Sequence, residues 1–215
     1  MAAGPVALAL GCAYLLGALP FSLWIGLAVH GVDIRQRGSG NVGATNLGRS
    51  CGWRSGAAGL VLDAAKGWAA VVAGGALAGT QGELGRVVLL LCGAAAVAGH
   101  MWPVFLLGHG GGKGVATSAG VFLALDPVAV AVCAALFAAT VAWSRFVSLG
   151  SVLASAALPV ALFARASGAR DPVFLLSIPI ALGVIWKHRT NLARIREGTE
   201  SRLGRQPEAS GEGPA

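Results

Sequence analysis

Polar residues are scarce in this chain of 215 residues, and most of those that could do chemistry fall into three short clusters between apolar runs. The first cluster is GSGNVGATNLGR, residues 38–49. Glycine lets backbone N–H groups come close to an anion, and short polar side chains add hydrogen-bond donors. An arginine adds a planar fork of donors that suits phosphate. The pattern predicts a phosphate-binding segment, against the alternative of an ordinary polar loop. Its candidate residues are Ser39, Gly40, Asn41, Thr45, Asn46 and Arg49.

The second cluster lies in GHMWPVFLLGHGGGKGVAT, residues 99–117, where glycines surround Lys113. A Walker loop needs Gly-Lys followed by Ser or Thr after a β-strand, whereas here Gly114 follows the lysine and the flanks are apolar runs. The pattern therefore excludes an NTPase but still suits an anion cradle. His100 is a candidate binding residue, with an interfacial structural role as the alternative. The candidate glycines of the loop are Gly111, Gly112 and Gly114.

The third cluster is HRTNLARIREGTE, residues 188–200, which follows the last apolar run. Its candidate residues are His188, Arg189, Asn191, Arg194 and Glu200. Taken alone, the segment favours the interpretation as a basic stretch that anchors a helix to anionic headgroups.

Two charged residues stand inside an apolar run, in LDAAKG. Asp63 and Lys66 lie three residues apart, on one face of a predicted helix. Charges in hydrocarbon are costly, so both side chains should face the interior of a helix bundle. A structural pair is the favoured interpretation, and a proton or ion path is the alternative.

Lipid must be the solvent for the elements that carry these clusters. Hydrophobic residues make up 55% of the chain and charged residues 12%, against about 25% charged residues in soluble domains. The mean hydropathy is +0.72. The composition predicts an all-α, polytopic integral membrane protein, because spanning segments must satisfy their own backbone. The apolar runs cover about 5–29, 56–80, 84–107, 115–125, 127–143, 147–164 and 172–186.

The topology depends on whether Asp126-Pro127 is a turn between two spans or a kink within one. A turn gives seven spans, with twelve Lys and Arg residues on one face and three on the other; a kink gives six, with seven and eight. Positive residues favour the cytoplasmic side, so we predict seven transmembrane helices, with the N-terminus outside and the C-terminus in the cytoplasm. In the seven-span arrangement the cytoplasmic residues are Arg35, Arg37, Arg49, Arg54, Lys113, Arg145, Lys187, Arg189, Arg194, Arg196, Arg202 and Arg205.

The net charge and the spacing of possible metal ligands limit the molecules that the protein could bind. The net charge is +7, but the basic residues flank apolar runs, so we expect contact with membrane lipids and no nucleic acid. The chain has no cluster with metal-ligand spacing, and we expect no metal and no cofactor. Residues 1–201 are expected to form one membrane domain. Residues 202–215, rich in Gly, Pro, Glu and Ser, are expected to be a disordered cytoplasmic tail.

Together the clusters resemble the bacterial membrane acyl-phosphate:glycerol-3-phosphate acyltransferases, the PlsY family. Three motifs of that family are matched in order, and LDAAKG and SRFVSLGS are similar to further stretches of it. The resemblance extends from about residue 14 to residue 200 and implies a seven-helix fold with its active site facing the cytoplasm of a bacterial inner membrane. The matching segments are SGNVGATNLGR (39–49), GHMWPVFLLGHGGGKGVAT (99–117) and HRTNLARIREGTE (188–200).

The resemblance also implies a role for individual residues. Ser39 and Arg49 match the family's essential serine and arginine, and Lys113 matches the lysine of its glycine-rich motif. His188 and Asn191 match a catalytically important pair. Glu200, with Asp63 and Lys66, is expected to serve structure.

The implied reaction moves an acyl group from acyl phosphate to the 1-hydroxyl of sn-glycerol 3-phosphate, which gives lysophosphatidic acid and inorganic phosphate. Acyl phosphate is already activated, so no covalent acyl-enzyme is needed. The substrate's own phosphate is the favoured base, with His188 as the alternative. A transporter for a phosphorylated solute is the rival function, although no internal repeat supports it. The oligomeric state is left open, with a monomer as the working expectation.

Overall fold

The computed structural model describes residues 3–79, 82–108, 110–166 and 168–204 of the chain. Within these residues the chain forms α-helices and short 3₁₀ helices and no strand, which agrees with the predicted all-α class. The elements are α1 (Ala3–Ala18), α2 (Phe21–His30), η1 (Ile34–Gln36), α3 (Ala44–Cys51), α4 (Trp53–Ala78), α5 (Gly82–Met101), η2 (Val104–Leu106), α6 (Val115–Leu125), α7 (Pro127–Ser144), α8 (Val147–Phe163), α9 (Pro172–Lys187) and α10 (Arg189–Arg196).

The first apolar run, 5–29, is not one helix. It is broken into α1 and α2, which are bent by 40° at Leu19-Pro20. Proline has no N–H to continue the helical ladder, and its ring disfavours the helical conformation in the residue before it. Gly31, with φ of 63°, ends α2 in the left-handed conformation that glycine accepts readily.

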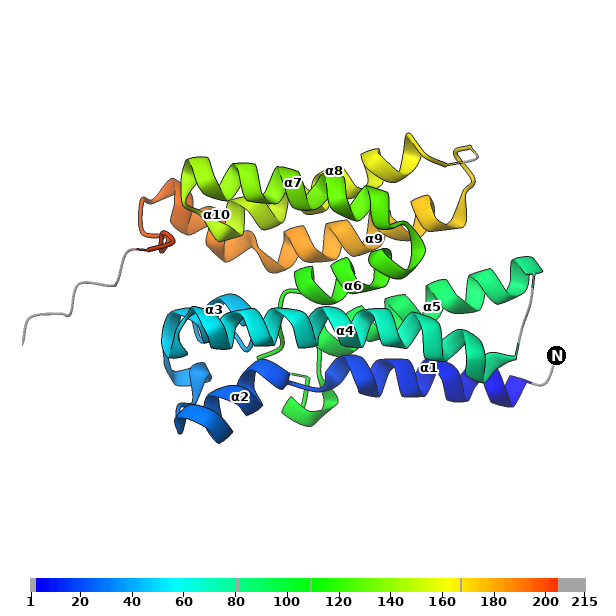
Figure 1. Ribbon diagram of the computed structural model, residues 1–215, viewed down its shortest axis with the longest axis horizontal. Coiled ribbons are helices and arrows are strands. Elements are labelled where there is room, and N and C mark those ends of the chain that lie inside the picture. Colours follow the sequence, from blue (N-terminus) through cyan, green and yellow to red (C-terminus); the bar gives the residue numbers. More distant parts are fainter. Residues whose placement is uncertain (1–2, 80–81, 109, 167, 205–215) are drawn as a thin grey trace, which may run out of the picture.

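Asp126-Pro127 forms a turn between α6 and α7. The Asp126 carboxylate caps α7 by accepting the N–H of Ala129 at 2.9 Å, and Pro127 occupies the first helical position, where its missing N–H costs nothing. The two helices run in opposite directions on either side of this turn (Figure 1). Arg165, at the end of α8, holds the same carboxylate at 2.8 Å. Of the two alternatives for this segment, the structure therefore has the turn.

Glycines bring two pairs of helices close together. In the α4–α6 pair, a Cβ on Gly67 would lie 2.2 Å from the Thr117 carbonyl oxygen, and one on Gly120 would lie 1.8 Å from that of Ala64. The α1–α5 pair has the same feature, because a Cβ on Gly17 would lie 2.0 Å from a backbone oxygen of α5. Small residues permit such contacts, which drive helix association in lipid.

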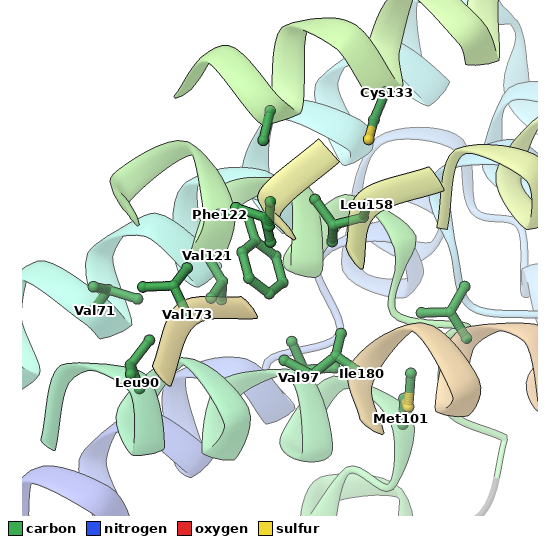
Figure 2. Packing of buried hydrophobic residues seen from close by; sticks show 13 residues of the cluster. Val71, Leu90, Val97, Met101, Val121, Phe122, Cys133, Leu158, Val173 and Ile180 are labelled. Atoms are coloured by element: carbon green, nitrogen blue, oxygen red, sulfur yellow. The ribbon is translucent and has the colours of Figure 1, made fainter. Parts of the chain in front are cut away.

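The largest apolar core surrounds α6. Val121 and Phe122 of this helix are fully buried. Around them lie Leu90 of α5, Leu158 of α8 and Val173 of α9 (Figure 2). Helix α6 is thus the central element of the bundle, and its first residues are fixed by the packing of the rest.

Much of the remaining apolar surface is exposed, as a lipid environment requires. Three helical segments are long and apolar enough to cross a bilayer, or up to five if the bent pairs α1–α2 and α9–α10 each count as one span. Helices α6 and α8 are apolar but shorter. The predicted number of seven spans and the orientation of the termini stay predictions. The three segments are Trp53–Leu77, Gly82–Leu106 and Pro127–Ser144.

Candidate active site

The three polar clusters meet at one end of the bundle. Helices α3 and α10 lie at this end, opposite the N-terminal end of α1 (Figure 1). A pocket there is bordered by α3 and its preceding loop, the start of α6, the start of α8 and the α9–α10 junction. Its lining includes Ser39, Asn41, Thr45, Asn46, Arg49, Asp63, His100, Lys113, Gly114, Ser148, Ser151, His188, Asn191 and Glu200.

The first glycine-rich loop is shaped from within by Asn46. Its buried amide donates to the carbonyl oxygens of Ile34, at 2.7 Å, and Arg37, at 3.1 Å. Its oxygen accepts the Ser39 N–H at 2.9 Å. Both amide hydrogens are therefore used by the loop, so Asn46 holds the backbone beside the pocket. Gly38 needs to be glycine here, because it has φ of 57° and a Cβ would lie 2.4 Å from the Asn46 oxygen.

Asn41 joins the first loop to the second. Its amide nitrogen donates to the Gly111 carbonyl oxygen at 3.1 Å, and its oxygen accepts the Gly43 N–H at 3.0 Å. Gly40, which precedes Asn41, has φ of 70°, and Thr45 of α3 lines the pocket. Two segments about seventy residues apart in sequence thus form one wall.

A chain of hydrogen bonds links Lys113 to the C-terminal cluster. The Lys113 ammonium donates to the Asn191 oxygen, and the Asn191 amide donates to Glu200 at 2.7 Å. Lysine only donates and a carboxylate only accepts, so the two neighbours fix which way the Asn191 amide points. Glu200 also accepts from Ser148 at 2.8 Å and from Arg194 at 2.8 Å. Glu200 is therefore the buried acceptor that orders this side of the pocket.

Glu200 and Lys113 titrate away from their usual values. Burial alone would raise the pKa of Glu200, but the hydrogen bonds from Arg194, Asn191 and Ser148 outweigh it and lower that pKa. Burial lowers the pKa of Lys113 to about 8, although Glu200 opposes the shift. Burial also lowers the pKa of Arg49, whose guanidinium nonetheless stays charged at any physiological pH.

The pocket has two cations without a carboxylate partner. Asp63 pairs with Lys66 at 2.8 Å, and Glu200 pairs with Arg194 at 2.8 Å. Neither Arg49 nor Lys113 is in an ion pair with any residue that the structure describes. Two positive charges that are not in an ion pair, beside glycine-rich backbone, are suited to bind phosphate groups.

His188 closes the pocket from the α9–α10 junction. The residue is buried, and its Nδ1 lies 2.8 Å from the Val184 carbonyl oxygen. A carbonyl can only accept, so Nδ1 carries the proton. In the neutral ring, Nε2 is then left as an acceptor, which suits a hydroxyl group better than a phosphate oxygen.

The buried group of Asp63, Lys66 and His100 supports the second glycine loop. Lys66 also donates to the Leu19 carbonyl oxygen at 2.8 Å, where α1 and α2 separate. Nδ1 of His100 lies 3.7 Å from Asp63. The Gly112 N–H donates to the His100 carbonyl at 3.0 Å, and a Cβ on Gly112 would lie 1.9 Å from Nε2 of the same histidine. His100 therefore packs directly on the loop that carries Lys113.

Other pocket residues carried no signal of chemistry in the sequence. Leu60 of α4, Phe137 of α7 and Val147 of α8 supply an apolar part of the lining, and Ser151 lies beside Ser148 on α8. A leucine, a phenylalanine or a serine within an apolar run is expected anywhere in a membrane helix. The similarity of SRFVSLGS (144–151) to the PlsY family is the one signal in the sequence that covers any of them, and it covers Val147, Ser148 and Ser151 alike.

The fold and the pocket define an all-helical membrane protein with a site suited to phosphate, and comparison with known proteins narrows this class. A profile of the family described as glycerol-3-phosphate acyltransferase matches residues 7–198. A glycerol-3-phosphate acyltransferase of Desulforudis audaxviator is 45% identical over 203 residues, which cover 94% of this chain and 98% of that protein. One of Desulfotalea psychrophila is 44% identical over 87% of this chain and 92% of that protein.

Solved structures agree with the sequence comparison. The integral membrane glycerol 3-phosphate acyltransferase PlsY in its glycerol 3-phosphate form matches with a TM-score of 0.82 and 36% identity, over 93% of this chain and 96% of that one. Its lysophosphatidic acid form matches with a TM-score of 0.80 and 34% identity, over 93% and 95% of the two chains. The chain belongs to the glycerol-3-phosphate acyltransferase family.

Proposed function

We propose that this protein transfers a fatty acyl group from acyl phosphate to the 1-hydroxyl of sn-glycerol 3-phosphate. The products are 1-acyl-glycerol 3-phosphate, which is lysophosphatidic acid, and inorganic phosphate. Membership of the family supports an acyltransferase, and the solved relatives are described in forms with glycerol 3-phosphate and with lysophosphatidic acid. The reaction is the first acylation step of phospholipid synthesis.

One observation carries the proposal for the site: Arg49 and Lys113 line one pocket, and neither has an acidic partner among the described residues. Acyl phosphate and glycerol 3-phosphate each bring a phosphate, so two anions must be held close together. Positioning two reactants in this way can contribute roughly 7–11 kcal/mol to a bimolecular step. We assign one phosphate to each cation and leave open which is which.

The acyl group can pass directly from donor to acceptor, without an acyl-enzyme intermediate. The 1-hydroxyl oxygen attacks the acyl carbonyl carbon, the bond from that carbon to the phosphate oxygen breaks, and phosphate leaves. The hydroxyl proton passes to a phosphate oxygen of the substrate. Ser39 and Asn191 add neutral hydrogen-bond donors, and Nε2 of His188 accepts from a hydroxyl of glycerol and so orients it. The remaining proposed binding groups are Asn41, Thr45 and the amides of Gly111 and Gly114. The N–H groups of Gly40 and Gly112 are not counted among them, because they donate to the carbonyl oxygens of Arg37 and His100, at 3.0 Å each.

The acyl chain needs an apolar path from the lipid to the pocket. Leu60 of α4 and Phe137 of α7 line the pocket and come from helices that lie on opposite sides of α6 (Figure 1). We place the acyl chain between α4 and α7, over α6. This path would let the donor enter sideways from the membrane, while glycerol 3-phosphate enters from water.

The proposed orientation puts the pocket at the cytoplasmic side of a bacterial inner membrane. The support is the asymmetry of positive charge, because the basic residues gather at the end of the bundle that carries the pocket. Seven spans, with the N-terminus outside, follow if α6 and α8 cross the membrane despite their length. The protein is proposed to act as a monomer.

The product and the donor can be tested directly. Purified protein in lipid-containing detergent would be given radiolabelled glycerol 3-phosphate with either palmitoyl phosphate or palmitoyl-CoA, and the lipid product separated and identified. We expect 1-palmitoyl-glycerol 3-phosphate with palmitoyl phosphate only. Product from palmitoyl-CoA would refute the donor, and no product from well-folded protein would refute the reaction. Uptake of glycerol 3-phosphate into proteoliposomes would then test the transporter alternative.

A further inference from the structure

The chain turns back over the pocket after α10. The Gly198 residue has φ of 74°, and its N–H donates to the Ile195 carbonyl at 3.2 Å. The N–H groups of Thr199 and Glu200 both donate to the Arg194 carbonyl, at 2.8 and 3.1 Å. These bonds end the helix in a turn that glycine favours at this position. Residues 201–204, here called the C-terminal strap, therefore leave α10 in a fixed direction.

The far end of the strap is attached to the turn between α7 and α8. The Leu203 N–H donates to the Arg145 carbonyl oxygen at 2.7 Å. The Arg202 guanidinium lies 5.0 Å from the centre of the Phe146 ring, within the range of a cation–π contact. The strap is thus anchored on both sides, by Glu200 in the pocket and by the α7–α8 turn.

Arg49 meets the strap between these two anchors. Its guanidinium donates to the Ser201 carbonyl oxygen at 3.2 Å, which is its one hydrogen bond within the described part of the chain. Arg49 comes from α3, so this contact joins residues 152 positions apart. A carbonyl oxygen is neutral and occupies one of five guanidinium donors, so the charge and most of the donors remain available to an anion.

We propose that the C-terminal strap is a positioning element that holds the Arg49 guanidinium in place for the substrate phosphate. An arginine side chain has many rotamers, and ordering it on binding weakens affinity. The strap orders Arg49 in advance, through the Ser201 carbonyl and the two anchors. This inference rests on the proposed function, because it assigns Arg49 to a substrate phosphate.

Variants of the full-length protein can remove one anchoring contact of the strap at a time, and each has a matched control variant that leaves the contact in place. Leu203→Pro removes the N–H that binds Arg145, whereas the matched Leu203→Ala keeps it, and the Leu203 side chain is 49% exposed. Arg202→Ala removes the contact with Phe146, and Arg196→Ala is its control on the exposed part of α10. Arg49→Lys identifies the substrate whose KM depends on Arg49.

We expect Leu203→Pro and Arg202→Ala to raise the KM of that same substrate by about two- to tenfold, as for one long side chain that must be ordered on binding. Their kcat and melting temperature should stay near those of wild type, and both control variants should behave as wild type. An unchanged KM, a higher KM for the other substrate, or a loss of kcat and stability alone would overturn the inference. A wild type inactive with both substrates would instead overturn the proposed function, and the inference with it.

Discussion

Lys113 is the residue whose charge state most directly limits the proposed site. It is largely buried, its only partner among the described residues is the neutral oxygen of Asn191, and burial lowers its pKa to about 8. A lysine holds an anion only while it is protonated. The lowered pKa therefore means that the binding form predominates below about pH 8 and is lost as the pH rises through that value.

We expect kcat/KM to fall above about pH 8, because this parameter reports the free enzyme. Lys113→Arg should move the fall to higher pH, since the guanidinium stays charged. The measurement is a pH profile of phosphate release for both proteins. Identical alkaline limbs in wild type and variant would show that Lys113 does not set the profile.

Variants of His188 can distinguish the two candidate bases, which are the substrate phosphate and His188 itself. Glutamine keeps hydrogen-bonding groups near the position of Nε2 but cannot take up a proton. If the substrate phosphate is the base, His188→Gln should retain activity within about tenfold of wild type, whereas loss of a general base costs roughly 10²- to 10⁴-fold. Single-turnover rates of His188→Gln and His188→Ala give the comparison. Equal, large losses in the two variants would assign the base to His188.

The residues of the site were more predictable than the way they are used. Ser39, Arg49 and Lys113 stand in glycine-rich clusters that are unusual in so apolar a chain, whereas His188 and Asn191 could be selected only through the resemblance of their segment to the PlsY family. Their mutual contacts could not be predicted, since nothing in the sequence says that Asn191 joins Lys113 to Glu200. Such contacts depend on helix packing across the bundle.

At the scale of elements, α6 links packing to the site. Its N-terminal end carries Gly114 and follows Lys113, and its middle is held against α4 at van der Waals contact of the backbones. A shift of α6 would move the second glycine loop relative to the other two clusters.

Gly120→Ala tests this link. The new Cβ would lie 1.8 Å from the Ala64 carbonyl oxygen, so α4 and α6 must separate. Overpacking of this kind costs about 1–3 kcal/mol, which for a chain of this size is a fall of roughly 2–12 °C in melting temperature. Activity should fall with it. Gly11→Ala is the matched control, because a Cβ on Gly11 meets nothing within 4 Å. A stable, active Gly120→Ala variant would contradict the close approach.

The positions at which the helices break could not be predicted from the apolar runs. The apolar run 5–29 was continuous, yet Pro20 divides it, and the run 84–107 ends its α-helix at Met101 before Trp102-Pro103. Hydropathy measures how apolar a run is, whereas proline decides where its backbone can continue. Both breaks border a small cavity that shares Asp63 and His100 with the pocket. Lys66 fixes the first break through the Leu19 carbonyl.

At the scale of the whole molecule, the seven-span and six-span topologies predict different results in a cysteine-labelling experiment. In a background whose own cysteines are replaced, single cysteines at Arg54 and Arg170 would be labelled in intact cells with a membrane-impermeant maleimide. Seven spans place the two positions on opposite sides, so Arg170→Cys should react and Arg54→Cys should not. Six spans place both on one side, and equal labelling would contradict our topology. The native cysteines are Cys12, Cys51, Cys92 and Cys133.

The central claim is that Arg49 binds a substrate phosphate in an acyl transfer that uses acyl phosphate. The most direct test measures phosphate release from palmitoyl phosphate, with and without glycerol 3-phosphate, by wild type, Arg49→Ala and Arg54→Ala. Arg54 is a matched control, since its guanidinium lies over Trp53, outside the pocket lining. We expect release that requires both substrates, falls by about 10²-fold or more in Arg49→Ala, as for loss of a charge-stabilising donor, and persists in Arg54→Ala. Release without glycerol 3-phosphate, or equal activity in the two variants, would contradict the account.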